Sequence, residues 1–82
     1  MEQKILVTGE GVRQEIIGES LFDCADTAYR RFRGKQVELT WLRPIGYVDG
    51  NDLFIDDEYL DRQSVKEIMK NGDGPLQEGE GE

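Results

Sequence analysis

The first apolar residues of the chain alternate with polar ones. In "KILVTGEGVRQEIIG", Ile5 and Val7 share one face of a strand, because successive side chains of a strand point to opposite faces. Glu10 lies between two glycines, and glycine readily adopts the positive φ that a tight hairpin turn requires. Ile16 and Ile17 are adjacent, so in a regular strand they point to opposite faces. The pattern predicts a β-hairpin at the start of the chain.

The following segment, "ESLFDCADTAYRRFRG", has the period of an amphipathic helix. Ser20 is placed to cap its N-terminus, and Gly34 is placed to end it as the residue that follows the C-cap. The arginines near its end suit the negative end of the helix dipole. The apolar face consists of Leu21, Phe22, Cys24, Ala25, Ala28, Tyr29 and Phe32.

After this helix the pattern returns to strands. "QVELTWLRP" alternates and predicts a strand that Pro44 ends, since proline cannot donate a hydrogen bond to a neighbouring strand. "IGYV" and "LFI" flank "DGND", which is typical of a second hairpin. "DEYLDRQSVKEIMKNG" predicts a second helix, with Val65, Ile68 and Met69 on a narrow apolar stripe and Gly72 as its end.

The order β-β-α-β-β-α predicts an α+β fold of two layers. We expect an antiparallel sheet of about four strands, with one main helix packed on a face. A ubiquitin-like β-grasp fold begins with the same hairpin and helix and is the alternative, although no convincing final strand follows the second hairpin. Residues 1–70 form the predicted single small domain. Residues 71–82, "NGDGPLQEGEGE", are too polar and glycine-rich to bury a core and predict a flexible acidic tail.

Length and cysteine content limit how the domain is stabilised and where it works. At 82 residues we expect a net stability of about 3–5 kcal/mol. A homodimer, joined through a sheet edge or through the region of Tyr47, is one way to add buried surface. Cys24 is the single cysteine and the chain has no His, which excludes an internal disulfide and an ordinary zinc site and fits a cytoplasmic location. No apolar run approaches the about 20 residues of a membrane span, so we expect no membrane partner.

The net negative charge comes entirely from the second half of the chain. Residues 1–43 hold seven bases and seven acids, whereas residues 44–82 hold three bases and eleven acids, which accounts for the net charge of −8. Such a surface repels nucleic acid and is attracted to basic surfaces. Direct binding of nucleic acid is therefore disfavoured, and a protein with a basic surface is the expected partner.

The segment "DGNDLFIDDEYLD" contains the candidate binding residues. Its acids come from a turn, a strand end and a helix start, and such residues can be neighbours in space. Tyr47 of the same hairpin supplies an aromatic anchor. The predicted partner-binding residues are Tyr47, Asp49, Asp52, Asp56, Asp57, Glu58 and Asp61.

These features predict a small acidic protein–protein interaction module. One form of it is an inhibitor that occupies the nucleic-acid-binding surface of its partner by charge mimicry. In size and charge the chain resembles phage-encoded inhibitors of host defence or of nucleic-acid enzymes. The alternative is a small regulatory or nucleic-acid-binding module that uses the basic helix end, which contains Arg30, Arg31, Arg33 and Lys35.

The sequence lacks the residue patterns that are typical of metal sites and of catalytic sites. With Ile55 at the hydrophobic position of an EF-hand loop, Leu53 occupies the glycine position and Tyr59 replaces the bidentate glutamate, so no metal is expected. The lack of His excludes Ser-His and Cys-His pairs. Adjacent carboxylates such as Asp56 and Asp57 diverge rather than face each other across a substrate. We therefore predict a protein without cofactor that is not an enzyme, and a weak divalent-ion binder is the third and least favoured alternative.

Overall fold

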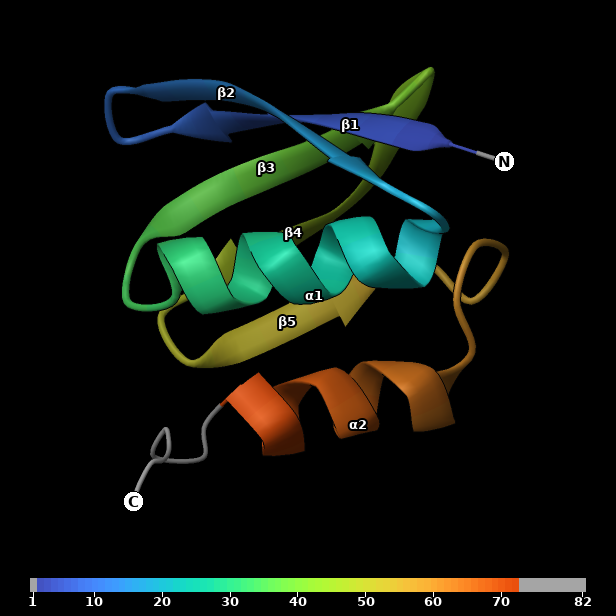
Figure 1. Ribbon diagram of the computed structural model, residues 1–82. Coiled ribbons are helices and arrows are strands. Elements are labelled where there is room, and N and C mark those ends of the chain that lie inside the picture. The colour runs from blue at the N-terminus through green and yellow to red at the C-terminus, as the bar shows by residue number, and fades with distance from the viewer. Residues whose placement is uncertain (1, 73–82) are drawn as a thin grey trace.

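The computed structural model describes residues 2–72, which form one antiparallel sheet and two helices (Figure 1). The five strands lie in the order β2-β1-β3-β4-β5, and every neighbouring pair is antiparallel. In chain order the elements are β1 (Gln3–Gly9), β2 (Val12–Gly18), α1 (Leu21–Phe32), β3 (Gln36–Trp41), β4 (Arg43–Asp49), β5 (Asp52–Ile55) and α2 (Arg62–Gly72).

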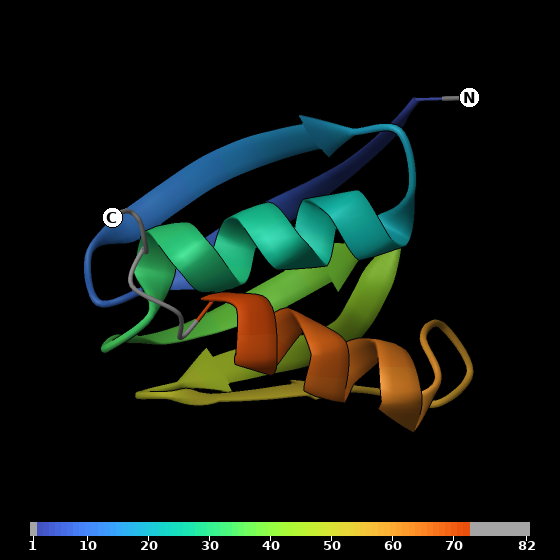
Figure 2. The same ribbon diagram turned by 60° about the horizontal axis from the view of Figure 1, so that its bottom comes forward.

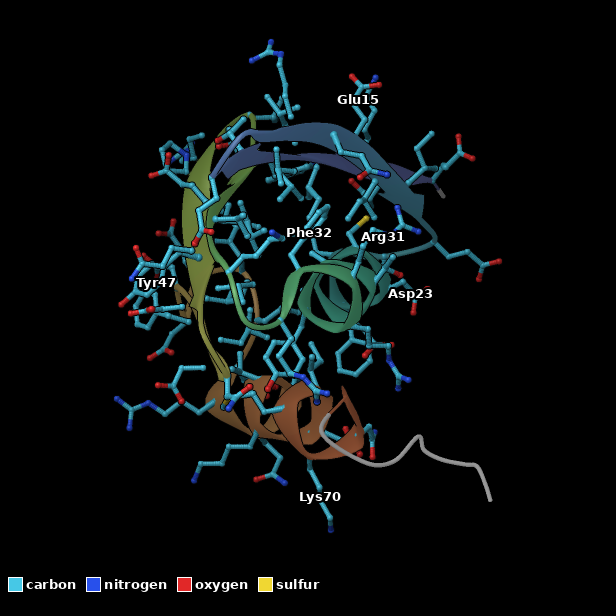
Figure 3. The ribbon with its side chains drawn as sticks, turned by 90° about the vertical axis from the view of Figure 1, so that its left-hand side faces the viewer. Glu15, Asp23, Arg31, Phe32, Tyr47 and Lys70 are labelled. Carbon is cyan, nitrogen blue, oxygen red and sulfur yellow. The ribbon has the colours of Figure 1, made fainter. Side chains whose placement is uncertain are left out.

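The sheet curves around α1, and both helices lie on its concave side. Figure 3 shows the strands passing from above α1 down one side of it, with α2 below. Figure 2 shows α2 beside both α1 and β5. The convex face of the sheet carries neither helix. Residues on that face can therefore meet another molecule without any rearrangement of the fold.

The core fills the space between the concave face and the helices. Alternation places one side chain of every two on this face, as the sequence pattern predicts for Ile5 and Val7, and of the adjacent Ile16 and Ile17 it is Ile16 that is buried. Cys24, which belongs to the predicted apolar face of α1, is fully buried. The other members of the core are Ala25, Ala28, Tyr29, Phe32, Val37, Leu39, Ile45, Val48, Leu53, Ile55, Val65 and Ile68.

The limits of α1 are set by the two residues that the sequence indicates. The Ser20 hydroxyl accepts a hydrogen bond of 3.1 Å from the Asp23 N–H, which satisfies a backbone donor that the first turn leaves unpaired. Gly34 follows the C-cap with a φ of +95°, a conformation that favours glycine. Both predictions for this helix are confirmed.

The sheet has five strands where about four were expected, because "QVELTWLRP" covers β3 and only the first two residues of β4, while "IGYV" lies in the remainder of β4 and "LFI" in β5. Leu42 has a φ of +59° and reverses the chain, so that Trp41 and Arg43 become partners in a hairpin. Pro44 does not end a strand as predicted. It is the second residue of β4, next to a register shift between β3 and β4, and such irregular places accept a residue without an N–H.

The end of the described chain also refines the sequence predictions. The ubiquitin-like alternative needs a strand after the second hairpin, and within residues 2–72 only α2 follows it. Asn71 and Gly72, assigned to the tail by the sequence, belong to α2. The remainder of the predicted tail, residues 73–82, lies outside the described residues. Neither of the two helices is long and apolar enough to cross a membrane.

Candidate protein-binding surface

Two aromatic side chains lie next to each other on the convex face. Tyr47 of β4 and Phe54 of β5 are direct cross-strand partners, and their rings stack with centroids 5.3 Å apart and planes 24° apart. Their neighbours Val48 and Leu53 point into the core, so alternation directs both rings outward. Figure 3 shows Tyr47 on the side of the sheet away from α1.

Both rings remain largely accessible to water. Tyr47 is 48% exposed and Phe54 is 52% exposed. Stacking with a neighbouring ring holds each side chain in place, so little conformational entropy remains to be lost when a partner covers them. An ordered, half-exposed aromatic pair is the kind of anchor that dominates the energy of protein–protein interfaces.

Carboxylates flank this aromatic pair on the same face. Glu38 of β3 is the cross-strand neighbour of Tyr47, and the Asp49–Asp52 pair lies two residues beyond the aromatic pair, next to the turn of the hairpin. The ion pairs between described residues, Lys4–Glu15 and Arg30–Asp26, include none of these three acids. Among residues 2–72, these three carboxylates therefore have no ion-pair partner.

A shallow hollow of about 540 Å³ lies beside Tyr47. Glu38 and Asp49 contribute carboxylates to its lining, and Thr8 and Gln36 contribute further polar groups. The Gln36 side-chain amide donates a 3.1 Å hydrogen bond to Asp49 Oδ1, which holds that carboxylate in position. The ring and the carboxylates together match the chemistry of a lysine or arginine side chain, which needs hydrogen-bond acceptors and favours an aromatic face.

The remaining predicted acids lie in the loop between β5 and α2, at the opposite end of β5. Asp56 Oδ1 accepts a 3.0 Å hydrogen bond from the Glu58 N–H and forms a local turn. Asp61 Oδ1 accepts a 2.7 Å hydrogen bond from the Ser64 N–H and so caps α2. Hydrogen bonds from Ser64 hold the pKa of the Asp61 carboxyl below its ordinary value. Asp57 and Glu58 point to solvent.

A groove of about 430 Å³ connects part of this loop with the aromatic pair. It runs between β5 and α2, and Phe54, Asp56 and Asp57 are among its lining residues. Val65 and Met69 provide apolar walls on the side of α2. The predicted residues thus form two groups: Tyr47, Asp49 and Asp52 on the convex face, and Asp56 and Asp57 at the groove. Phe54 belongs to both.

The sequence predictions missed Phe54 and Glu38. The signal for Phe54 was present in "LFI", because a strand that buries Leu53 and Ile55 must turn the residue between them to the other face. Glu38 follows from the same alternation between Val37 and Leu39. Its position beside Tyr47 depends on the register of β3 and β4, which the sequence pattern does not specify.

The predicted basic cluster at the end of α1 is partly used inside the fold. The Arg30 guanidinium donates a 3.0 Å hydrogen bond to Asp26 one turn earlier, within an ion pair. Arg33 donates a hydrogen bond to the Gly72 carbonyl and thereby joins the ends of the two helices. Arg31 and Lys35 are exposed. The cluster therefore serves the packing of α1 and α2 as well as the surface.

Cys24 has the features of a structural residue. Its thiol donates to the carbonyl oxygens of Gln3 at 3.5 Å and Ile16 at 3.7 Å, and burial raises the pKa of the thiol. Low exposure and a raised pKa both oppose reaction as a thiolate. Across residues 2–72, no group of three or more Cys, Asp or Glu side chains lies close enough to hold a metal ion.

Comparison with protein-family models, curated proteins and solved structures found no match.

Proposed function

We propose that this protein is a non-enzymatic protein–protein interaction module whose convex sheet face binds a basic surface of its partner. The observation that carries the proposal is the stacked, half-exposed pair of Tyr47 and Phe54, which is flanked by carboxylates that form no ion pair with another described residue. An aromatic pair alone suits any apolar partner. The adjoining Glu38, Asp49 and Asp52 add selectivity for lysine and arginine.

The aromatic and acidic parts of the surface have separate roles in binding. A cation over an aromatic ring contributes about 0.5–1 kcal/mol at an exposed site and about 2 kcal/mol when water is excluded. Covering the rings also removes apolar area from water, which contributes roughly 25 cal/mol per Å². The carboxylates and the net charge of −8 accelerate the encounter with a basic partner. Binding is then fast and weakens as salt rises.

The partner class that best fits this charge is a protein that handles nucleic acid. A basic cleft that normally holds phosphates attracts carboxylates by the same electrostatics, so the module would act as an inhibitor by charge mimicry. An inhibitor of the phage type is one form of this function. The groove between β5 and α2 adds no net negative charge to the proposed binding surface, because Arg62 and Lys66 line it together with Asp56 and Asp57.

Affinity capture from the native cell at low and high salt tests the proposal, with the captured protein then purified and titrated. We expect Tyr47→Ala with Phe54→Ala, and separately Asp49→Lys with Asp52→Lys, to weaken its binding by about 30-fold or more. Arg31→Glu with Lys35→Glu is the matched control, because it changes two exposed charges on α1 and its following turn. Equal binding by all three variants would reject the proposed surface.

A competition assay tests the inhibitor form separately. If the partner surface is one that holds nucleic acid, a DNA or RNA oligonucleotide and this protein should exclude each other from the purified partner. If both bind at the same time, the protein does not occupy the nucleic-acid-binding surface, and the inhibitor form of the proposal is rejected.

A further inference from the structure

The two edges of the sheet differ in how they are covered. At one edge α2 lies against β5, and the Leu53 N–H, which points away from β4, donates a 3.3 Å hydrogen bond to the sulfur of Met69. At the other edge, β2 pairs with β1 along seven residues and has no second neighbour within residues 2–72 (Figure 1). An uncovered edge presents backbone donors and acceptors that another strand can pair with.

The register of the first hairpin identifies these backbone groups. The turn consists of Glu10 and Gly11, with φ values of +48° and +80°, so Gly9 and Val12 close the hairpin as a hydrogen-bonded pair. Hydrogen-bonded and non-hydrogen-bonded pairs alternate in an antiparallel ladder. The residues of β2 whose N–H and C=O groups point away from β1 are therefore Arg13, Glu15 and Ile17.

The side chains of the same residues are exposed on the convex face. Arg13 is positive and Glu15 is negative, and Ile17 leaves 58% of its surface in water. Glu15 forms one ion pair, at 3.6 Å, with Lys4 of the neighbouring strand, and both of these side chains are more than half exposed. Its carboxylate therefore retains room for a further partner.

We infer that β2 is the seam of a homodimer, in which the β2 strands of two copies pair antiparallel about an axis at Gln14. This register places Arg13 of each copy opposite Glu15 of the other, so the seam contains two cross-strand pairs of opposite charge. The residues that face each other are those with outward backbone groups, as an antiparallel ladder requires. The edge is complementary to itself.

Charge also excludes the neighbouring register. A shift of the axis to Glu15 places the two Glu15 side chains opposite each other and Arg13 opposite Ile17 of the other copy. Like charges in direct cross-strand contact destabilise a pair. A second copy in the Gln14-centred register thus fits the order of charges along β2, and a generic extended peptide has no such match.

Sedimentation velocity over a concentration series tests the inference on the full chain. We expect the wild type to shift from monomer to dimer as concentration rises. Glu15→Arg places two arginines opposite each other at both ends of the seam and should weaken the dimer by about tenfold or more. Arg13→Glu should do the same with two glutamates. An equimolar mixture of these two variants should form a heterodimer, because the strand with two arginines then faces the strand with two glutamates.

Two further variants distinguish pairing along β2 from a dimer that forms at a different surface. Lys4→Gln removes the internal ion pair of Glu15 and should leave the dimer intact. Glu15→Pro deletes an N–H that β1 does not use, so the monomer should keep its far-ultraviolet circular dichroism spectrum while the dimer is lost. If this variant fails to fold, the mixing experiment still decides.

Several results would overturn the inference. A monomer at every concentration would mean that Arg13 and Glu15 only keep a bare edge from pairing. A dimer that withstands both charge reversals would place the seam elsewhere, and loss of that dimer in Tyr47→Ala would locate it at the aromatic pair of β4 and β5. A mixture of Glu15→Arg and Arg13→Glu that stays monomeric would reject the register.

Discussion

The Tyr29 hydroxyl donates a 2.6 Å hydrogen bond to the carbonyl of Asn51, and so connects α1 to the turn between β4 and β5. Tyr29 is among the largest buried side chains, and its ring packs against the end of α2 at Gly72. One side chain thus joins both helices to the hairpin that carries Tyr47, Asp49, Asp52 and Phe54.

Removal of the Tyr29 hydroxyl should lower stability without changing the fold. We expect Tyr29→Phe to reduce the free energy of unfolding by about 1 kcal/mol, because the part-buried hydrogen bond to Asn51 is lost. Urea denaturation followed by circular dichroism measures the change. Tyr47→Phe is the matched control, since it removes the hydroxyl of a half-exposed ring, and it should stay within about 0.5 kcal/mol of wild type. Equal effects of both variants would contradict the role of Tyr29.

Gly72 should tolerate no larger side chain. A Cβ at this position would lie 2.6 Å from the ring of Tyr29, so either α2 or the ring must move. We expect Gly72→Ala to cost about 1–3 kcal/mol, as overpacking usually does. Asn71→Ala, one residue earlier in α2 at an exposed position, is the control. Thermal unfolding compares the two variants. If Gly72→Ala is as stable as the control, the Tyr29 ring or α2 moves aside at little cost.

The cap of α2 should contribute a pH-dependent part of the stability. Because the folded pKa of Asp61 is lowered, its contribution is present above the unfolded value, near the ordinary 3.8, and is lost as pH falls through the folded pKa. Asp61→Asn keeps an acceptor for the cap but cannot titrate. Stability curves of wild type and variant should therefore converge in acid and separate above about pH 4. Parallel curves over this whole range would refute the assignment.

Cys24 should react slowly while the protein is folded. Its raised pKa keeps the thiol neutral, and its burial restricts access for reagents. We expect an aromatic disulfide reagent to modify it far faster in urea than in buffer. The stabilising effect of the neutral thiol is present below the ordinary pKa of 9.0 and is lost as pH rises above it. Rapid modification of the native protein would show that the region of Gln3 and Ile16 opens readily.

Binding to the purified partner should depend on salt mainly through the acids. We expect the association rate of the wild type to fall steeply between about 50 and 200 mM salt, since screening shortens the range of charge attraction. Asp49→Lys with Asp52→Lys should flatten this dependence. Tyr47→Ala should instead raise the dissociation rate and leave the salt dependence close to that of wild type. Stopped-flow kinetics separates the two effects.

The sequence was sufficient to predict features that depend on residues close together in the chain, such as helix limits and the alternation within a strand. The limits of α1 follow from Ser20 and Gly34, and the burial of Val37 and Leu39 follows from alternation. The reversal at Leu42 was not predictable in this way, because a leucine with positive φ contradicts local preference and is held by the pairing of β3 with β4.

The arrangement of the acids required the three-dimensional structure. Asp49 and Asp56 are close in sequence, yet β5 stands between their loops, and its four residues span about 13 Å. The sequence therefore suggested one group where the structure has two. Conversely, Glu38 is distant in sequence from Phe54 but lies in the same row across the sheet.

The position of both helices on the concave side has a consequence for how this protein can change over generations. Glu38, Tyr47 and Phe54 are exposed on the bare side of the sheet, so substitutions there change the surface while the packing beneath stays the same. Under the proposed function, the scaffold could exchange one target for another with little loss of its own stability.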